Sequence, residues 1–154
     1  MLSGYFVKIK KRFFLMRIKA KFLRNNDGDT FKAIILVPSK KKYVDYYEQK
    51  ISVRLRNVDT FEISGKKAIQ QTKEENNLAQ MAKIRLNEIL SSNNGNIVLE
   101  LKYKDNRGSR WVCDVFVKGQ VVRVGDILKR ENLLTGKYED YKGRKKMNIN
   151  KLKK

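Results

Sequence analysis

Four acidic side chains of this strongly basic sequence are grouped at two places where carboxylates could act together. Asp27 and Asp29 are two residues apart, and Asp59 is followed closely by Glu62. Two or three carboxylates at one edge repel each other unless a cation joins them, and oxygen ligands favour a hard ion such as calcium or magnesium. Ordinary turn chemistry remains open, because Asp-Gly is a common hairpin turn and an Asp-Thr pair can cap a helix.

Three arginines could complete a phosphate-cleaving set. Arg54 lies in the apolar run that ends just before Asp59, and Arg107 and Arg110 precede a later apolar run. An arginine beside carboxylates can be a simple ion-pair partner, but its planar fork also binds phosphate. A metal ion with two arginines is sufficient for phosphodiester hydrolysis.

The composition excludes several classes of function. The chain has 154 residues and no histidine, which removes every scheme that needs imidazole as an acid, a base or a metal ligand. A single cysteine, Cys113, allows neither an intramolecular disulfide nor a cysteine-rich zinc site. Lys and Arg number 36 against 16 Asp and Glu, and this net charge of +20 favours nucleic acid as the partner, ahead of an anionic membrane or an acidic protein.

The hydrophobic pattern predicts the elements that must position these side chains. Three- and four-residue steps predict an amphipathic helix over 77–90, and a second short helix is expected over 121–129. Alternation of apolar and polar residues predicts five strands, at about 16–22, 31–37, 51–58, 97–103 and 111–117. This order is typical of a five-stranded oligonucleotide-binding (OB) fold, a Greek-key barrel with a helix between strands three and four. In such a barrel Asp29 and Asp59 should converge, because the start of strand two adjoins the end of strand three.

Three blocks of residues together resemble the signature of the staphylococcal nuclease (thermonuclease) family. They are Asp-Gly-Asp-Thr at 27–30, Val-Arg-Leu-Arg-Asn-Val-Asp-Thr-Phe-Glu at 53–62, and Arg110. The resemblance runs from about Met16 to Leu134. It implies that the carboxylates of Asp29 and Asp59 and the backbone carbonyl of Thr60 bind one calcium ion, and that Asp27 supports the site at its rim.

The same resemblance implies a catalytic role for three further residues. Glu62 would act as general base or orient the attacking water, while Arg54 and Arg110 would hold the scissile phosphate. The implied reaction is calcium-dependent, sequence-tolerant endonucleolytic cleavage of DNA, and of RNA as a second substrate, leaving 3′-phosphate ends. The chain departs from the family pattern at Phe61, where the family has proline, and Arg107 competes with Arg110 as the second arginine. The alternative is a catalytically inactive OB-fold module that binds single-stranded nucleic acid.

Other basic and aromatic residues are candidates for binding nucleic acid. The polar connection at 39–50 contains the lysine run at 40–42 and three tyrosines, and it could stack on bases and contact phosphates or simply be a solvated hairpin tip. Tyr138 and Tyr141 fall about where nucleotide-stacking tyrosines occur in the family. The nucleic-acid-binding candidates are Lys40, Lys41, Lys42, Arg107, Tyr138 and Tyr141.

The extent of the family resemblance, with basic segments on either side of it, divides the chain into three parts. We expect a basic N-terminal extension over 1–15, a nuclease domain over 16–134 and a basic tail over 135–154, with Met1 or Met16 as the true start. No apolar run approaches the roughly 18 residues that span a bilayer, and the first 23 residues alternate too finely for a signal peptide. We therefore expect a cytoplasmic protein. We also expect it to be a monomer whose partner is DNA or RNA.

Overall fold

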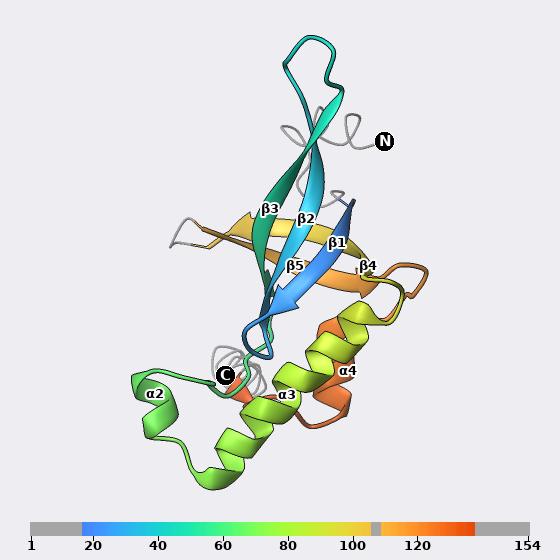
Figure 1. Cartoon of the computed structure of the whole chain (residues 1–154). Coiled ribbons are helices and arrows are strands. Elements are labelled where there is room, and N and C mark those ends of the chain that lie inside the picture. Colours follow the sequence, from blue (N-terminus) through green and yellow to red (C-terminus); the bar gives the residue numbers. More distant parts are fainter. Residues whose placement is uncertain (1–16, 106–108, 138–154) are drawn as a thin grey trace, which may run out of the picture.

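The computed structural model describes residues 17–105 and 109–137, and five strands of this part close into a barrel (Figure 1). The strands are β1 (Arg17–Asn25), β2 (Thr30–Pro38), β3 (Tyr46–Leu55), β4 (Asn96–Lys104) and β5 (Arg110–Val117). Their order around the barrel is β1-β2-β3-β5-β4. Neighbours pair antiparallel, except that β3 and β5 run parallel and so close the barrel. The predicted five-stranded OB-like barrel with helices is confirmed.

Alternation of side chains along the strands gives the barrel one apolar and one polar face. On β1, Ile18, Ala20 and Phe22 are buried, whereas the basic residues between them are exposed. Strands β2 and β4 and the inner half of β3 alternate in the same way, because successive side chains of a strand point to opposite faces. Strand β5 is buried on both faces from Val112 to Val117. The fully buried part of the barrel core includes Ile18, Val53, Ile97, Leu99 and Val115.

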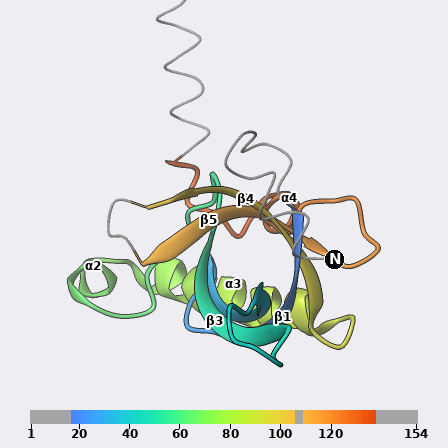
Figure 2. The ribbon, with the colours of Figure 1, turned by 90° about the horizontal axis from the view of Figure 1, so that it is seen from above.

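The described residues also form three helices outside the barrel: α2 (Lys66–Ile69), α3 (Lys73–Ser91) and α4 (Val124–Arg130). Helix α3 packs against β1, β4 and α4 at one end of the barrel, as Figures 1 and 2 show. Its start is four residues earlier than predicted from the apolar steps, since its first turn is polar and is held by a capping box between Thr72 and Glu75. None of the helices among the described residues is long and apolar enough to cross a membrane.

Strands β2 and β3 continue beyond the barrel as a projecting hairpin (Figure 1). The predicted polar connection over 39–50 is wrong in its second half, because β3 already begins at Tyr46. Residues 46–50 are all exposed, so this end of the strand has no buried face and shows no alternation in the sequence. The tip is correspondingly short, and Ser39 N–H donates to the Asp45 carbonyl at 2.9 Å across its base.

Little of the expected terminal segments falls in the described part of the chain. The N-terminal extension expected over 1–15 lies outside the described residues. Of the tail expected over 135–154, the structure describes residues 135–137.

Candidate active site

Arg54 joins the two separated acidic clusters. It lies near the end of β3, opposite Thr30, the first residue of β2. Its Nη1 lies 3.4 Å from Asp29 Oδ1 and its Nη2 lies 3.6 Å from Asp59 Oδ1. The predicted convergence of Asp29 and Asp59 is therefore confirmed, and one guanidinium offsets the charge of both carboxylates.

Asp29 is the most buried acid of this group, at 6% exposed. Its Oδ2 accepts a hydrogen bond from the backbone N–H of Thr60 at 3.1 Å. Burial raises the pKa of Asp29 from 3.8 to about 7, with Asp27 adding to the rise and Arg54 opposing it. The cost of ionising Asp29 in this position is what a bound cation would relieve.

Asp27 closes the turn that carries Asp29. Its Oδ1 accepts from the backbone N–H groups of Asp29 and Thr30, at 3.1 and 2.8 Å, and from the Thr30 hydroxyl at 2.7 Å. These contacts engage the Asp27 carboxylate in holding the turn that carries Asp29.

Gly28 allows this turn to press against helix α3 and the loop after Asp59. A Cβ at Gly28 would lie 2.6 Å from Ala82 Cβ and 2.9 Å from Thr60 Oγ1. The Thr60 hydroxyl is buried and has no hydrogen-bond partner among the described residues. A buried hydroxyl without a partner costs free energy, and its position beside Asp29 is where a bound water or ligand oxygen would satisfy it.

Two residues outside the predicted set hold the two acidic loops in place. Thr135, in the segment after α4, donates from its N–H to the Asp59 carbonyl at 2.9 Å and from its hydroxyl to Asp59 Oδ2 at 2.8 Å. Asn25 is buried and donates to the carbonyls of Asp27 and Lys83, at 2.9 and 2.8 Å, which ties the first loop to α3. The turn composition around Asn25 was visible in the sequence, whereas nothing local marked Thr135.

The donor set fits a hard cation only in part. Among the described residues, no group of three or more His, Cys, Asp or Glu side chains is placed to hold a metal ion. Asp29 and Asp59 nevertheless face one cationic group, and both are oxygen donors of the kind that calcium and magnesium prefer. Because calcium takes six to eight oxygen ligands, an ion here would keep several waters beside these two carboxylates.

The side chain of Glu62 takes no part in the hydrogen bonds and ion pairs that hold this cluster together in the described part of the chain. Its backbone is held by Gln71, whose amide accepts from the Glu62 N–H at 2.7 Å and donates to its carbonyl at 2.9 Å. The carboxylate is exposed, at the edge of a hollow between the loop and helices α2 and α3, and forms no hydrogen bond or ion pair with the described residues. It is therefore accessible to water.

Arg110 lies on the outer face of β5, beside Ser52 of β3. Its Nε donates to Asp105 Oδ2 at 2.7 Å, a contact that fixes the side chain at the edge of a shallow groove also lined by Thr30. Arg110 thus shares the outer face with Arg54, because its register partner Ser52 lies two residues from Arg54 along β3. The competing candidate Arg107 lies outside the described residues.

The three lysines predicted to bind nucleic acid, Lys40–Lys42, lie at the tip of the β2–β3 hairpin. They are exposed, and so is Tyr43, which is 91% exposed and lies 5.4 Å from the Lys42 ammonium. Eight steps along β2 separate this tip from Thr30 by about 27 Å, so these lysines are remote from the acidic cluster. The other two candidates, Tyr138 and Tyr141, lie outside the described residues.

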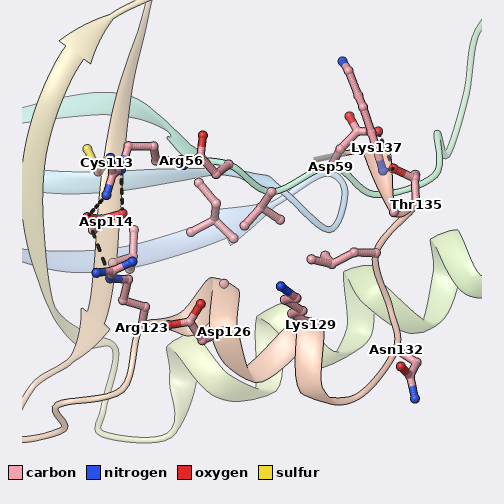
Figure 3. A pocket seen from close by; sticks show the side chains of 17 residues that line it. Arg56, Asp59, Cys113, Asp114, Arg123, Asp126, Lys129, Asn132, Thr135 and Lys137 are labelled. Carbon is pink, nitrogen blue, oxygen red and sulfur yellow. Dashed lines mark hydrogen bonds and ion pairs between the residues drawn. The ribbon is translucent and has the colours of Figure 1, made fainter. Parts of the chain in front are cut away.

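A second hollow, of about 190 Å³, has Asp59 of the acidic cluster in its lining (Figure 3). Asp59 lies at one end of it, and Asp114 lies between Arg56 and Arg123 at the other. Arg56 makes two bonds to the buried Asp114 carboxylate, at 3.0 and 2.8 Å, and these bonds raise the pKa of Arg56. This end of the hollow is thus closed by a paired charge cluster.

Comparison with known proteins adds no relative from which a role could be taken. No protein-family model and no curated protein matches this chain. The assignment of function therefore depends on the barrel and on the geometry of the cluster around Arg54.

Proposed function

We propose that this protein is a calcium-dependent endonuclease of the staphylococcal nuclease type that hydrolyses DNA or RNA to 3′-phosphate products. The observation that carries the proposal is the placement of Asp29 and Asp59 on one guanidinium, that of Arg54. The family resemblance assigns Asp29 and Asp59 to metal binding and Arg54 to phosphate binding. The raised pKa of Asp29 and the unpartnered Thr60 hydroxyl, among the described residues, further support a ligand at this place.

Calcium, when bound, would supply a positive charge that polarises the phosphate and neutralises the two carboxylates. Asp29 and Asp59 would hold the ion, with Asp27 and Thr135 fixing the two loops that carry them. Because these loops are anchored by hydrogen bonds, the ligands need little rearrangement on binding.

The basic residues on the outer face would act on the phosphate itself. Arg54 and Arg110 present planar forks whose N–H groups bind non-bridging oxygens and stabilise the charge that grows on them in the transition state. Asp105 positions Arg110 for this contact.

Glu62 would accept the proton of the attacking water. The water oxygen forms a bond to phosphorus, the bond from phosphorus to the 5′ oxygen breaks, and the leaving oxygen takes a proton from solvent. The products are a 3′-phosphate and a 5′-hydroxyl. The exposed Glu62 carboxylate suits this role, since it is open to water and is not consumed by an ion pair in the described part of the chain.

A second candidate function is single-stranded nucleic-acid binding without catalysis. The observation that favours it is that the Glu62 carboxylate forms no hydrogen bond or ion pair with the described residues, Asp29 and Asp59 included. Glu62 also follows Phe61, where the family has proline. Under this alternative the barrel binds a strand through its basic face and leaves it intact.

The two functions are distinguished by following a labelled oligonucleotide with calcium, with magnesium and with chelator. The nuclease proposal predicts fragments with calcium alone, and predicts that phosphatase treatment shifts their mobility because they end in 3′-phosphate. Binding without fragments in all three conditions would reject the nuclease and support the binding module.

A further inference from the structure

Four residues form one row across four neighbouring strands. In the sheet register Arg24 of β1 is opposite Lys32 of β2, Lys32 is opposite Ser52 of β3, and Ser52 is opposite Arg110 of β5. All four line one groove of about 180 Å³ on the outside of the barrel. We call these four residues the basic row.

Among the residues that the structure describes, those lining this groove include no acid. Lys32 Nζ is hydrogen-bonded to the Ser52 hydroxyl, and Arg110 is paired with Asp105 beyond the groove. Arg24 is exposed, and its side chain makes no hydrogen bond or ion pair with any residue that the structure describes. Three cations facing one groove repel each other, so an anion lying along the groove would stabilise them.

We propose that the basic row is a second phosphate-binding subsite, which binds the polynucleotide backbone on one side of the scissile phosphate. The proposal rests on the proposed function, because the row ends at Arg110, one of the two arginines assigned to that phosphate. Thr30 lines the same groove and is the register partner of Arg54, so the row is continuous with the candidate active site.

The dimensions of the row suit more than one phosphate. Three strand spacings separate Arg24 from Arg110, which is about 14 Å. A strand lying along the row would therefore cross the β-strands and meet Arg24 and Lys32 at successive backbone positions. Two further lysines lie in a neighbouring row on the same face of the sheet. Lys21 of β1 and Lys50 of β3 are the register partners of Ile34, which is two residues along β2 from Lys32.

A polynucleotide fits the row better than an acidic peptide does. Arginine forms two parallel hydrogen bonds with either a phosphate or a carboxylate, and the serine hydroxyl can donate to either, so the choice of ligand depends on the neighbouring site. Because the basic row is continuous with Arg54 and Arg110, one ligand must occupy both the row and the candidate active site. The proposed polynucleotide substrate is long enough to do so.

The test is the equilibrium binding of labelled 12-nucleotide DNA and RNA strands in chelator, where calcium-dependent cleavage is absent. The variant is Arg24→Gln, Lys32→Gln, and the control is Lys73→Gln, Lys118→Gln, which removes the same charge at exposed positions that line none of the grooves described above. Lys32 is half-buried, so Arg24→Gln alone is measured as well, and thermal melting checks that each variant folds.

We expect the double variant to bind the 12-mer about tenfold or more weakly than the control does. Each lost phosphate contact reduces the slope of log affinity against log salt by about 0.7 for a single strand, so the double variant should lose about 1.4 and Arg24→Gln alone about half of that. Binding of a dinucleotide, which reaches only the scissile position, should change by less than twofold.

The proposal would be overturned if the variant and the control lost the same affinity for the 12-mer. It would also be overturned if the variant lost as much affinity for an oligoglutamate of similar length as for the 12-mer. Calcium-dependent cleavage tests the proposed nuclease function independently of this binding experiment. If calcium-dependent cleavage is absent but the row variant selectively loses affinity, the subsite stands and the barrel is a binding module. If the unaltered protein binds neither DNA nor RNA, both proposals are rejected.

Discussion

Arg54 lies between Asp29 and Asp59, with ion-pair distances of 3.4 and 3.6 Å. A positive charge in that position lowers the repulsion between the carboxylates, and it also competes with any cation that they would bind. The same guanidinium is the group proposed to bind the phosphate. Its roles in metal binding and in catalysis should therefore respond to mutation in opposite directions.

The first prediction concerns Arg54→Gln. Removing the guanidinium should slow cleavage by about 100-fold or more, because a preorganised donor to the transition state is lost. Calcium affinity should rise, since a positive charge beside the ion is removed. Titration calorimetry with calcium and a cleavage assay measure the two effects, and a variant that loses calcium affinity as well as activity would show that Arg54 is chiefly a structural partner of the acids.

The second prediction concerns pH and Asp29, whose pKa burial raises to about 7. A carboxylate must lose its proton to bind a metal, so calcium affinity should rise about tenfold per pH unit below 7 and level off above it. Without calcium the sign for stability is opposite. The folded state holds this proton more tightly than the unfolded state, so the free energy of unfolding falls as the pH rises from about 4 to 7.

Asp29→Asn is the control for this pH dependence. It should bind calcium weakly at every pH. Without calcium, its free energy of unfolding should no longer show the decrease between about pH 4 and 7 that the ionisation of Asp29 causes. Chemical denaturation at several pH values in chelator measures the second effect. An unchanged pH profile in Asp29→Asn would show that another group titrates.

At the scale of the elements, two loops bring the acids together, and each loop is anchored to a different helix. The loop between β1 and β2 is tied to α3 through Asn25, and the loop after β3 is tied to the segment beyond α4 through Thr135. The site therefore depends on the packing of both helices against the barrel.

The third prediction concerns Thr135→Val, which keeps the shape of the side chain but removes the hydroxyl that donates to Asp59 Oδ2 at 2.8 Å. Loss of a group that orients a metal ligand typically lowers metal affinity, and we expect about a tenfold loss. Stability should fall by about 1 kcal/mol. Thr135→Ser should restore calcium affinity, and a failure of serine to do so would mean that the hydroxyl is not what positions Asp59.

The fourth prediction concerns Gly28→Ala. The new methyl would meet Ala82 Cβ at 2.6 Å, and helix α3 or the turn must move to accommodate it. Overpacking of this kind costs about 1–3 kcal/mol, and the displaced turn should also weaken calcium binding. Thermal and denaturant unfolding measure the cost, and a change within about 0.5 kcal/mol would show that the contact between the turn and α3 is loose.

The elements that could be predicted from the sequence are those with one buried face. The alternation of β1 and the apolar steps of α3 reflect that burial directly. The outer end of β3 was missed because residues 46–50 are exposed on both faces, and the start of α3 was missed because Thr72 and Glu75 form a cap rather than a hydrophobic step. Both misses arise where a segment is ordered by backbone pairing or capping and not by core contact.

For the molecule as a whole, the acidic cluster could be predicted because it stands out in a chain of net charge +20. The fold order then indicated that Asp29 and Asp59 should meet. The contact of Thr135 with Asp59 joins residues 76 apart in the chain, in a segment without periodicity, so nothing local in the sequence indicated it. The basic row likewise depends on the register of four strands, which the alternation of one strand at a time does not define.

The measurement that tests the central claim most directly is cleavage of single-stranded DNA in calcium by the protein and by an Arg54→Ala, Glu62→Ala variant. Arg130→Ala, Glu74→Ala is the matched control, because it removes the same two residue types from exposed helix positions that line none of the hollows described above. We predict calcium-dependent cleavage that is lost in the Arg54, Glu62 variant and retained in the control. Cleavage that survives in the variant would place the chemistry elsewhere, and no cleavage by the unaltered protein would leave a barrel that binds nucleic acid without cutting it.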